Sequence, residues 1–417
     1  MIKSKNLDWS ILLIILSYLS FVIGFFINEN SSGGGKIDFE HTLSTVNIFK
    51  LGILDAINHT EYESSRPPLF AILNSFNPYN YSDFSLRLSN FIFNCIIPLF
   101  FYLLIKKQNN FDKNIALSLT SLILLSPYFR TTSFWALEEN LPFLFFFITL
   151  ILLPLNNIKY QNIIIISIFS SLAVYSEQKF IFLSFFTYIY FLNHKKNFKD
   201  FFYISLIYFI TAIPYIYLIS QWGAITPPQP SYRFGLNLVN ISYILSIINF
   251  YFIPLFIFLI LDNQLKDLVK DLKRREFIVI ILIVLINFIL LPDFKSLWGN
   301  GVISKISYYF INTLEVNVKL IQLLFMIYNC FGSFFIYLIL SKNFKNLLPF
   351  IIIFIQACFI QVVHQEYIDP LFYLLIFCYF EYEKISIYKN KLIYMYLLFS
   401  IMFLIFANLY YGFLIQV

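Results

Sequence analysis

The chain of 417 residues is 59% hydrophobic and 21% aromatic, and only 12% of its residues are charged. A soluble domain carries about 25% charged residues, so this composition excludes a soluble globular protein and indicates a chain that lies in lipid. The net charge of +6 gives no indication of nucleic-acid binding. The four cysteines, Cys95, Cys330, Cys358 and Cys378, fall in apolar runs and show neither a disulfide framework nor metal-ligand spacing.

Apolar runs separated by polar residues predict an all-α polytopic membrane protein with about 13 transmembrane helices, each needing roughly 20 apolar residues. We expect one transmembrane domain over residues 1–417, with no separate soluble domain. The first run follows Lys3 and Lys5 and is too long for the core of a cleaved signal peptide, so it is predicted to be an uncleaved anchor. The predicted spans are 9–28, 84–105, 114–128, 138–154, 161–176, 180–193, 201–220, 238–261, 276–292, 317–340, 347–363, 368–382 and 392–414.

The distribution of charge predicts the orientation of these spans. With the N-terminus in the cytoplasm, 19 of the 29 basic residues fall in cytoplasmic loops and 10 remain for the other side, in agreement with the positive-inside rule. We therefore expect a multi-pass protein of a bacterial cell or inner membrane. The loops at 29–83, 130–140, 177–179, 221–235, 292–315 and 364–369 are predicted to be extracytoplasmic.

The first of these loops, residues 29–83, is long and polar in an otherwise apolar chain. Within it, the stretch 38–57 has apolar residues at a spacing of three to four, which predicts a helix on the membrane surface. These residues are Phe39, Leu43, Val46, Phe49, Ile53 and Ile57. A second, shorter helix of this kind is predicted over 303–314. The first loop also carries most of the residues that could do chemistry. These are Asp38, Glu40, His41, Asp55, His59, Glu61, Glu63 and Arg66.

Asp38 and Glu40 follow a run of three glycines, Gly33 to Gly35, that lets the chain reverse at the end of the first span. Carboxylates can act as general bases or as metal ligands, so a divalent metal is one possibility and no other cofactor is indicated. Residues i and i+2 point to different faces of a helix. The alternative is a solvated loop or the first turn of a helix, where acids suit the helix dipole.

Further charged candidates lie at the end of the first loop and in later parts of the chain. Arg66 precedes Pro67 and Pro68, which restrict the backbone, and an arginine held in place suits a phosphate; the alternative is a loop end that enters the next helix. Arg87 lies one turn inside the second span and could contact a substrate, snorkel to the interface or pair with Asp83. The other candidate contacts are Glu138 and Glu139 at the start of the fourth span, Glu177 and Lys179, Arg233, and the cluster of His364, Glu366 and Asp369.

The order of these elements resembles the GT-C class of integral membrane glycosyltransferases, and is most similar to the branch of protein mannosyltransferases and aminoarabinose transferases. Asp38 matches the acid at the start of the first outer loop in that branch. Residues 66–70, Arg-Pro-Pro-Leu-Phe, match a His-Pro-Pro-Leu-Tyr-like element with arginine in place of histidine. Residues 85–89 match the arginine-bearing start of the next span, and residues 136–140 the acidic start of the fourth.

The resemblance implies an inverting transfer of a hexose or pentose from a polyprenyl-phosphate donor to a lipid, glycan or protein acceptor, on the extracytoplasmic face. It implies Asp38 as the catalytic base, with Glu40 as the substitute. Substrate contacts would come from Arg66, His59, Glu61, Arg87, Glu138, Lys179, Arg233 and His364. Three other classes stay open: a flippase or transporter of lipid-linked oligosaccharides, an O-antigen-type polymerase, and a structural membrane protein without activity, which the many polar residues of the first loop disfavour. Repeats and polar residues at mid-membrane depth would favour the first, and a large later loop the second.

Overall fold

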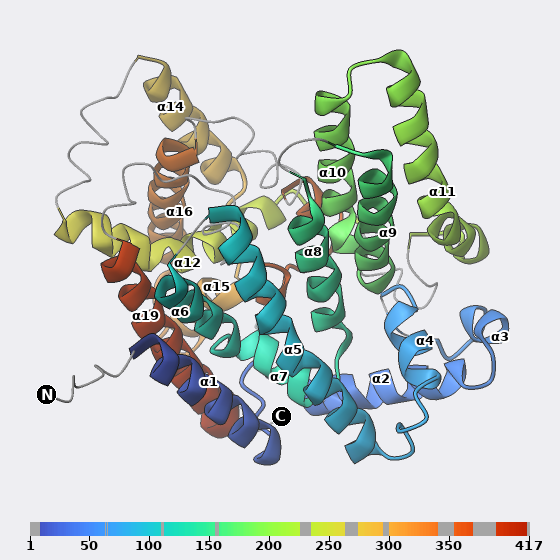
Figure 1. The fold of residues 1–417 in the computed structure, drawn as a ribbon. Coiled ribbons are helices and arrows are strands. Elements are labelled where there is room, and N and C mark those ends of the chain that lie inside the picture. The colour runs from blue at the N-terminus through green and yellow to red at the C-terminus, as the bar shows by residue number, and fades with distance from the viewer. Residues whose placement is uncertain are drawn as a thin grey trace, which may run out of the picture. The chain divides into compact units, whose positions relative to one another are not determined.

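The computed structural model describes residues 9–62, 64, 66–109, 112–154, 158–225, 235–262, 274–294, 300–340, 354–369 and 389–414. The regular elements in these ranges are helices, and no β-strand occurs among them (Figure 1). The predicted all-α fold class is therefore confirmed. Arg233 and Glu63 lie outside the described residues, as do residues 347–353 of the predicted span 347–363 and most of the predicted span 368–382.

The chain divides into two compact units, residues 1–231 with 400–417 and residues 232–399. The helices of the first unit are α1 (Trp9–Phe26), α2 (Gly35–Phe49), α3 (Ile53–Ile57), α4 (Leu69–Ser75), α5 (Asp83–Asn109), α6 (Lys113–Leu124), α7 (Pro127–Phe134), η1 (Glu138–Asn140), α8 (Leu141–Leu152), α9 (Tyr160–Ser176), η2 (Gln178–Phe180), α10 (Ile181–His194), α11 (Phe198–Trp222) and η8 (Tyr410–Leu414). Those of the second are α12 (Asn240–Leu261), α14 (Arg274–Ile289), α15 (Gly301–Asn312), α16 (Val318–Leu340), η5 (Gln365–Tyr367) and the start of α19 (Lys389–Leu409).

Several helices are long and apolar enough to cross a membrane. Among the described residues there are five of them, in α1, α5, α11, α12 and α19, and a sixth if α7 and the following η1–α8 segment form one span bent by 120°. Each predicted span other than 347–363 and 368–382 contains a helix, but several of these helices are too short to meet the same criterion. The chain is thus a membrane protein by its helices, and the number of 13 spans stays a prediction.

The segment between the third and fourth predicted spans is folded differently from the expectation of an outer loop over 130–140. The helix of the third predicted span, α6, ends at Leu124. Ser126 caps the start of α7, because its side chain accepts a hydrogen bond of 3.1 Å from the Phe129 N–H, and Pro127 occupies the first helical position. Residues Arg130 to Phe134 are buried. The predicted loop over 130–140 therefore begins as a buried helix, and its extracytoplasmic position stays a prediction.

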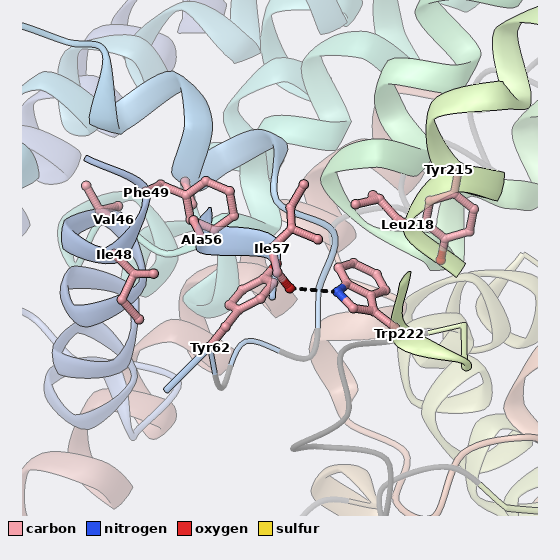
Figure 2. Packing of buried hydrophobic residues seen from close by; sticks show 10 residues of the cluster. Val46, Ile48, Phe49, Ala56, Ile57, Tyr62, Tyr215, Leu218 and Trp222 are labelled. Atoms are coloured by element: carbon pink, nitrogen blue, oxygen red, sulfur yellow. Dashed lines mark hydrogen bonds between the residues drawn. The ribbon is translucent and has the colours of Figure 1, made fainter. Parts of the chain in front are cut away.

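The first loop folds as three helices. The single helix expected over 38–57 is instead two, because α2 ends at Phe49 and Gly52, with a φ of 137°, precedes α3. The apolar residues of α2 are covered by protein: Val46 and Phe49 pack in one cluster with Tyr62 of the same loop and with Trp222 at the end of α11 (Figure 2). The indole Nε1 of Trp222 donates a hydrogen bond of 3.1 Å to the carbonyl oxygen of Ile57. This packing holds the loop against the helices of the first unit, where α2 lies crosswise to α8 and α9 (Figure 1).

Candidate functional site

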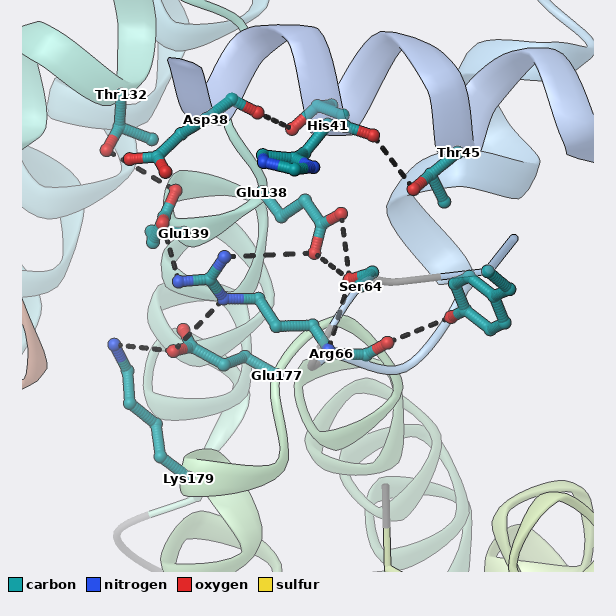
Figure 3. A network of polar contacts seen from close by, with 12 residues as sticks. Asp38, His41, Thr45, Ser64, Arg66, Thr132, Glu138, Glu139, Glu177 and Lys179 are labelled. Carbon is teal, nitrogen blue, oxygen red and sulfur yellow. Dashed lines mark hydrogen bonds and ion pairs between the residues drawn. The ribbon is translucent and has the colours of Figure 1, made fainter. Parts of the chain in front are cut away.

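Arg66 is held in a fixed position within the first loop, between α3 and α4. Its carbonyl oxygen accepts a hydrogen bond of 2.9 Å from the buried Tyr62 hydroxyl, and its N–H donates one of 3.1 Å to Ser64 Oγ. Pro67 and Pro68 follow it and limit the backbone, as the sequence predicted. The side chain therefore leaves the backbone in one direction and extends beneath α2 (Figure 3).

Three glutamates surround the Arg66 guanidinium. Its Nη2 lies 2.6 Å from Glu139 Oε1, its Nε lies 3.7 Å from Glu177 Oε1, and its Nη1 lies 4.0 Å from Glu138 Oε2. Glu138 also accepts hydrogen bonds of 3.1 and 3.2 Å from Ser64 Oγ. Glu138 and Glu139 come from η1, and Glu177 from the break between α9 and η2, so interruptions of apolar helices supply all three carboxylates.

Lys179 completes this assembly, which we call the Arg66 network: Arg66, Glu138, Glu139, Glu177 and Lys179. The Lys179 Nζ lies 2.9 Å from Glu177 Oε1 and near the rings of Phe143 and Phe180. The candidate substrate contacts Arg66, Glu138 and Lys179 are therefore brought together. Two cations face three carboxylates, so with every group ionised the network carries one excess negative charge.

Burial makes the carboxylates of the network depend on their partners. Glu138 lies in η1, before the apolar helix α8 begins, and its side chain is 6% exposed. A buried carboxylate needs charged or hydrogen-bonding partners, which are here Arg66 and Ser64.

Asp38 lies at the exposed edge of this network. Gly33 and Gly34 adopt positive φ values of 78° and 72°, which lets the chain reverse after α1 and start α2. Asp38 Oδ2 turns back over this reversal, 3.2 Å from where a Cβ on Gly34 would lie. Figure 3 shows Asp38 and His41 on the face of α2 that looks toward Glu139 and Glu138. The catalytic candidate is thus exposed and next to the buried carboxylates.

The other candidates of the first loop lie elsewhere. Glu40 is exposed on α2, two residues from Asp38 and separated from it by the buried Phe39. His59 and Glu61 form a turn in which His59 Nδ1 accepts a hydrogen bond of 3.2 Å from the Glu61 N–H. Neither belongs to the network drawn in Figure 3.

Arg87 projects from the second turn of α5 and has uncharged partners. Its Nε donates to the Phe134 carbonyl oxygen and its Nη2 to Asn28 Oδ1, both at 2.7 Å. The guanidinium carbon lies 4.2 Å from the centre of the Trp135 ring. Trp135 also packs beside Phe39, so Arg87 and the first turn of α2 meet at one aromatic side chain. Among the described residues, the hydrogen-bond partners of Arg87 are therefore neutral.

His364 belongs to the second unit. It is half-buried before η5, where its ring lies 5.5 Å from that of Tyr367. In the same segment, the buried Asp369 accepts a hydrogen bond of 2.6 Å from Tyr251, which in turn accepts one of 3.0 Å from Gln365. This polar group belongs to the second unit alone.

From the sequence, Glu139 and Glu177 were only further candidate contacts, and the structure places both beside Arg66. The sequence indicated no role for Glu29, Ser64 or Arg130. The pair of adjacent acids at 138–139 in a chain with so few charges was the one available signal. Among the described residues, no group of three or more His, Cys, Asp or Glu side chains is arranged to hold a metal ion.

No family model, curated protein or solved structure matches this chain. The function is therefore argued from the residues of the site and their surroundings.

Proposed function

We propose that this protein is a membrane glycosyltransferase that moves a sugar from a polyprenyl-phosphate donor to a hydroxyl of a lipid, glycan or protein acceptor on the extracytoplasmic face. The observation that supports it most is the convergence of an exposed carboxylate, Asp38, with the Arg66 network at the broken ends of apolar helices. A lipid-borne donor would place its sugar at these broken helix ends and its tail beside the apolar helices.

The proposed chemistry needs three groups. Asp38 takes the proton of the acceptor hydroxyl while the acceptor oxygen bonds to the anomeric carbon and the bond from that carbon to the donor phosphate oxygen breaks. Positive charge develops on the sugar in the transition state. The excess negative charge of the Arg66 network stabilises it from close by.

The departing phosphate needs a cation, and the structure favours Arg87 over Arg66 for this role. Three carboxylates surround Arg66, and they would repel a phosphate as strongly as Arg66 attracts it. Arg87 has neutral partners only in its described hydrogen bonds, and its fork suits a phosphate. We therefore assign Arg66 to positioning the glutamates, with Arg87 as the phosphate contact.

Reconstitution in liposomes tests the proposal. Purified protein is mixed with polyprenyl-phosphate hexoses and pentoses and a membrane-lipid or glycan acceptor, and release of polyprenyl phosphate is followed by mass spectrometry. Asp38→Asn should slow release by roughly 10²–10⁴-fold, the usual contribution of a positioned base. Glu40→Gln, an exposed acid on the same helix, is the matched control and should stay near the parent rate.

Two outcomes would count against the proposal. One is a parent protein that releases no polyprenyl phosphate from any donor while it moves a labelled lipid-linked oligosaccharide between leaflets, which would make it a transporter. The other is an Asp38→Asn variant as fast as the parent, with the loss found in Glu40→Gln or Glu138→Gln instead.

A further inference from the structure

Arg130 and Glu29 form a buried ion pair away from the Arg66 network. Arg130 is 1% exposed and donates from Nε to Glu29 Oε1 at 2.7 Å and from Nη2 to Glu29 Oε2 at 2.5 Å. Its remaining hydrogen bonds go to the carbonyl oxygens of Leu124 at 3.1 Å and Ser20 at 2.9 Å. The bidentate geometry fixes both distance and orientation between the end of α1 and α7.

The same two segments are joined at several further points. The indole Nε1 of Trp135 donates to the Glu29 carbonyl oxygen at 3.0 Å, Ser31 Oγ donates to the Pro127 carbonyl oxygen at 3.0 Å, and the Ser32 N–H donates to Thr131 Oγ1 at 2.9 Å. These contacts fasten residues 29–32 along α7. The chain then reverses at Gly33 and Gly34, and Asp38 follows in the first turn of α2.

Gly24 of α1 makes room for the pair. A Cβ at this position would lie 2.6 Å from Arg130 Nη2, 2.6 Å from Glu29 Oε2 and 2.7 Å from a ring carbon of Phe134. Gly24 lies in the last turn of α1, and the absence of a Cβ there leaves room for both side chains. Any side chain would push the two charged groups apart.

We propose that the Glu29–Arg130 pair is a positioning device that sets where Asp38 stands relative to the glutamates of η1; this inference rests on the proposed function. The pair fixes the start of the first loop on α7. Glu138 and Glu139 follow α7 directly, and Thr132 of α7 contacts Glu139 at 3.5 Å. α7 therefore holds the start of the first loop through Arg130 and contacts Glu139 through Thr132. Glu29 and Arg130 touch no substrate.

The first test separates turnover from binding. Glu29→Gln keeps the shape and removes the charge, and Arg130→Lys keeps the charge and removes the fork. Each should lower kcat by about 10²-fold, the usual cost of a displacement of roughly 1 Å at a reacting group, with the KM for the donor nearly unchanged. Gly24→Ala should act in the same direction by displacing the pair.

A covalent substitute for the pair shows whether position is what matters. Ser31 Oγ and Thr131 Oγ1 lie 3.4 Å apart, so Ser31→Cys with Thr131→Cys places two thiols together, in a background with the four native cysteines replaced by alanine. Oxidation should restore most of the kcat of Glu29→Gln, and reduction should abolish the rescue. The same two cysteines without Glu29→Gln form the control, active in both states.

Spin labels at Lys36 and Asp83, both exposed, give a readout that does not depend on activity. The distance distribution should be narrow in the parent and broad in Glu29→Gln. A broadened distribution in a protein that transfers no sugar would overturn the proposed function and leave the positioning role standing. Parent kcat in Glu29→Gln, or a disulfide verified by mass spectrometry that restores no turnover, would overturn the positioning role itself.

Discussion

The first unit contains two buried charge assemblies of opposite design, the Glu29–Arg130 pair and the Arg66 network. In the pair, one carboxylate matches one guanidinium with two short hydrogen bonds, and both side chains are at most 6% exposed. In the network, two cations face three carboxylates, one contact is as long as 4.0 Å, and Arg66 is 21% exposed. The pair is balanced and sealed, whereas the network is unbalanced and open to one side.

This difference indicates different uses. A sealed and balanced pair has neither a free proton site nor access for a ligand, so it can only hold segments together. An unbalanced group of carboxylates at an exposed edge can exchange protons and attract a developing positive charge. If the comparison is sound, the two assemblies will respond differently to substitution and to pH.

The largest effect should come from breaking the pair. Arg130→Met leaves Glu29 as a buried and unpaired carboxylate, and the free energy of unfolding should fall by about 3–5 kcal/mol. Thermal melting in detergent measures the change. The double variant with Glu29→Gln removes both charges and should recover most of the stability, because a buried pair exchanged for neutral groups is often nearly neutral in effect. An Arg130→Met variant with the same melting temperature as the parent would refute the view that the pair is sealed.

A smaller effect, dependent on pH, is expected from the centre of the network. Arg66→Ala leaves three carboxylates with Lys179 alone, and the loss at pH 8 should be about 1–3 kcal/mol. At pH 5 the loss should shrink, because the carboxylates can take up protons in place of the lost cation. Melting temperatures at both pH values decide the matter, and Arg66→Lys should fall between parent and alanine variant. An equal loss at pH 5 and pH 8 would contradict the proposed open network.

The smallest effect is expected where an arginine has neutral partners. Arg87→Lys keeps the charge and loses part of the hydrogen bonding to Asn28 and Phe134, which is worth about 1 kcal/mol. If Arg87 contacts the donor phosphate, the KM for the donor should rise roughly fivefold with little change in kcat. Arg66→Lys should instead lower kcat with little change in the KM for the donor. A common response of both variants would remove the distinction between a phosphate contact and a positioning arginine.

Much of the local structure could be predicted from the sequence. Apolar runs predicted helices, the glycine run predicted the reversal after α1, and the spacing of Phe39, Val46 and Phe49 predicted α2. These features depend on neighbouring residues, whose propensities and periodicity are visible along the chain. The prolines after Arg66 likewise indicated a rigid element. What the sequence could not supply was the partner of any of these residues.

The pairings were decided by the tertiary structure alone. Glu29 and Arg130 are 101 positions apart, and Arg66 meets glutamates from two other helix breaks. Such contacts depend on the angle at which α7 turns back and on how the first loop packs against α11. A charged side chain in an apolar protein pairs with whichever opposite charge this packing brings within reach. Residue type and helix pattern along one chain contain no measure of those angles. The sequence therefore determined where the helices and the charges lie along the chain, and the packing of the helices decided which charges meet.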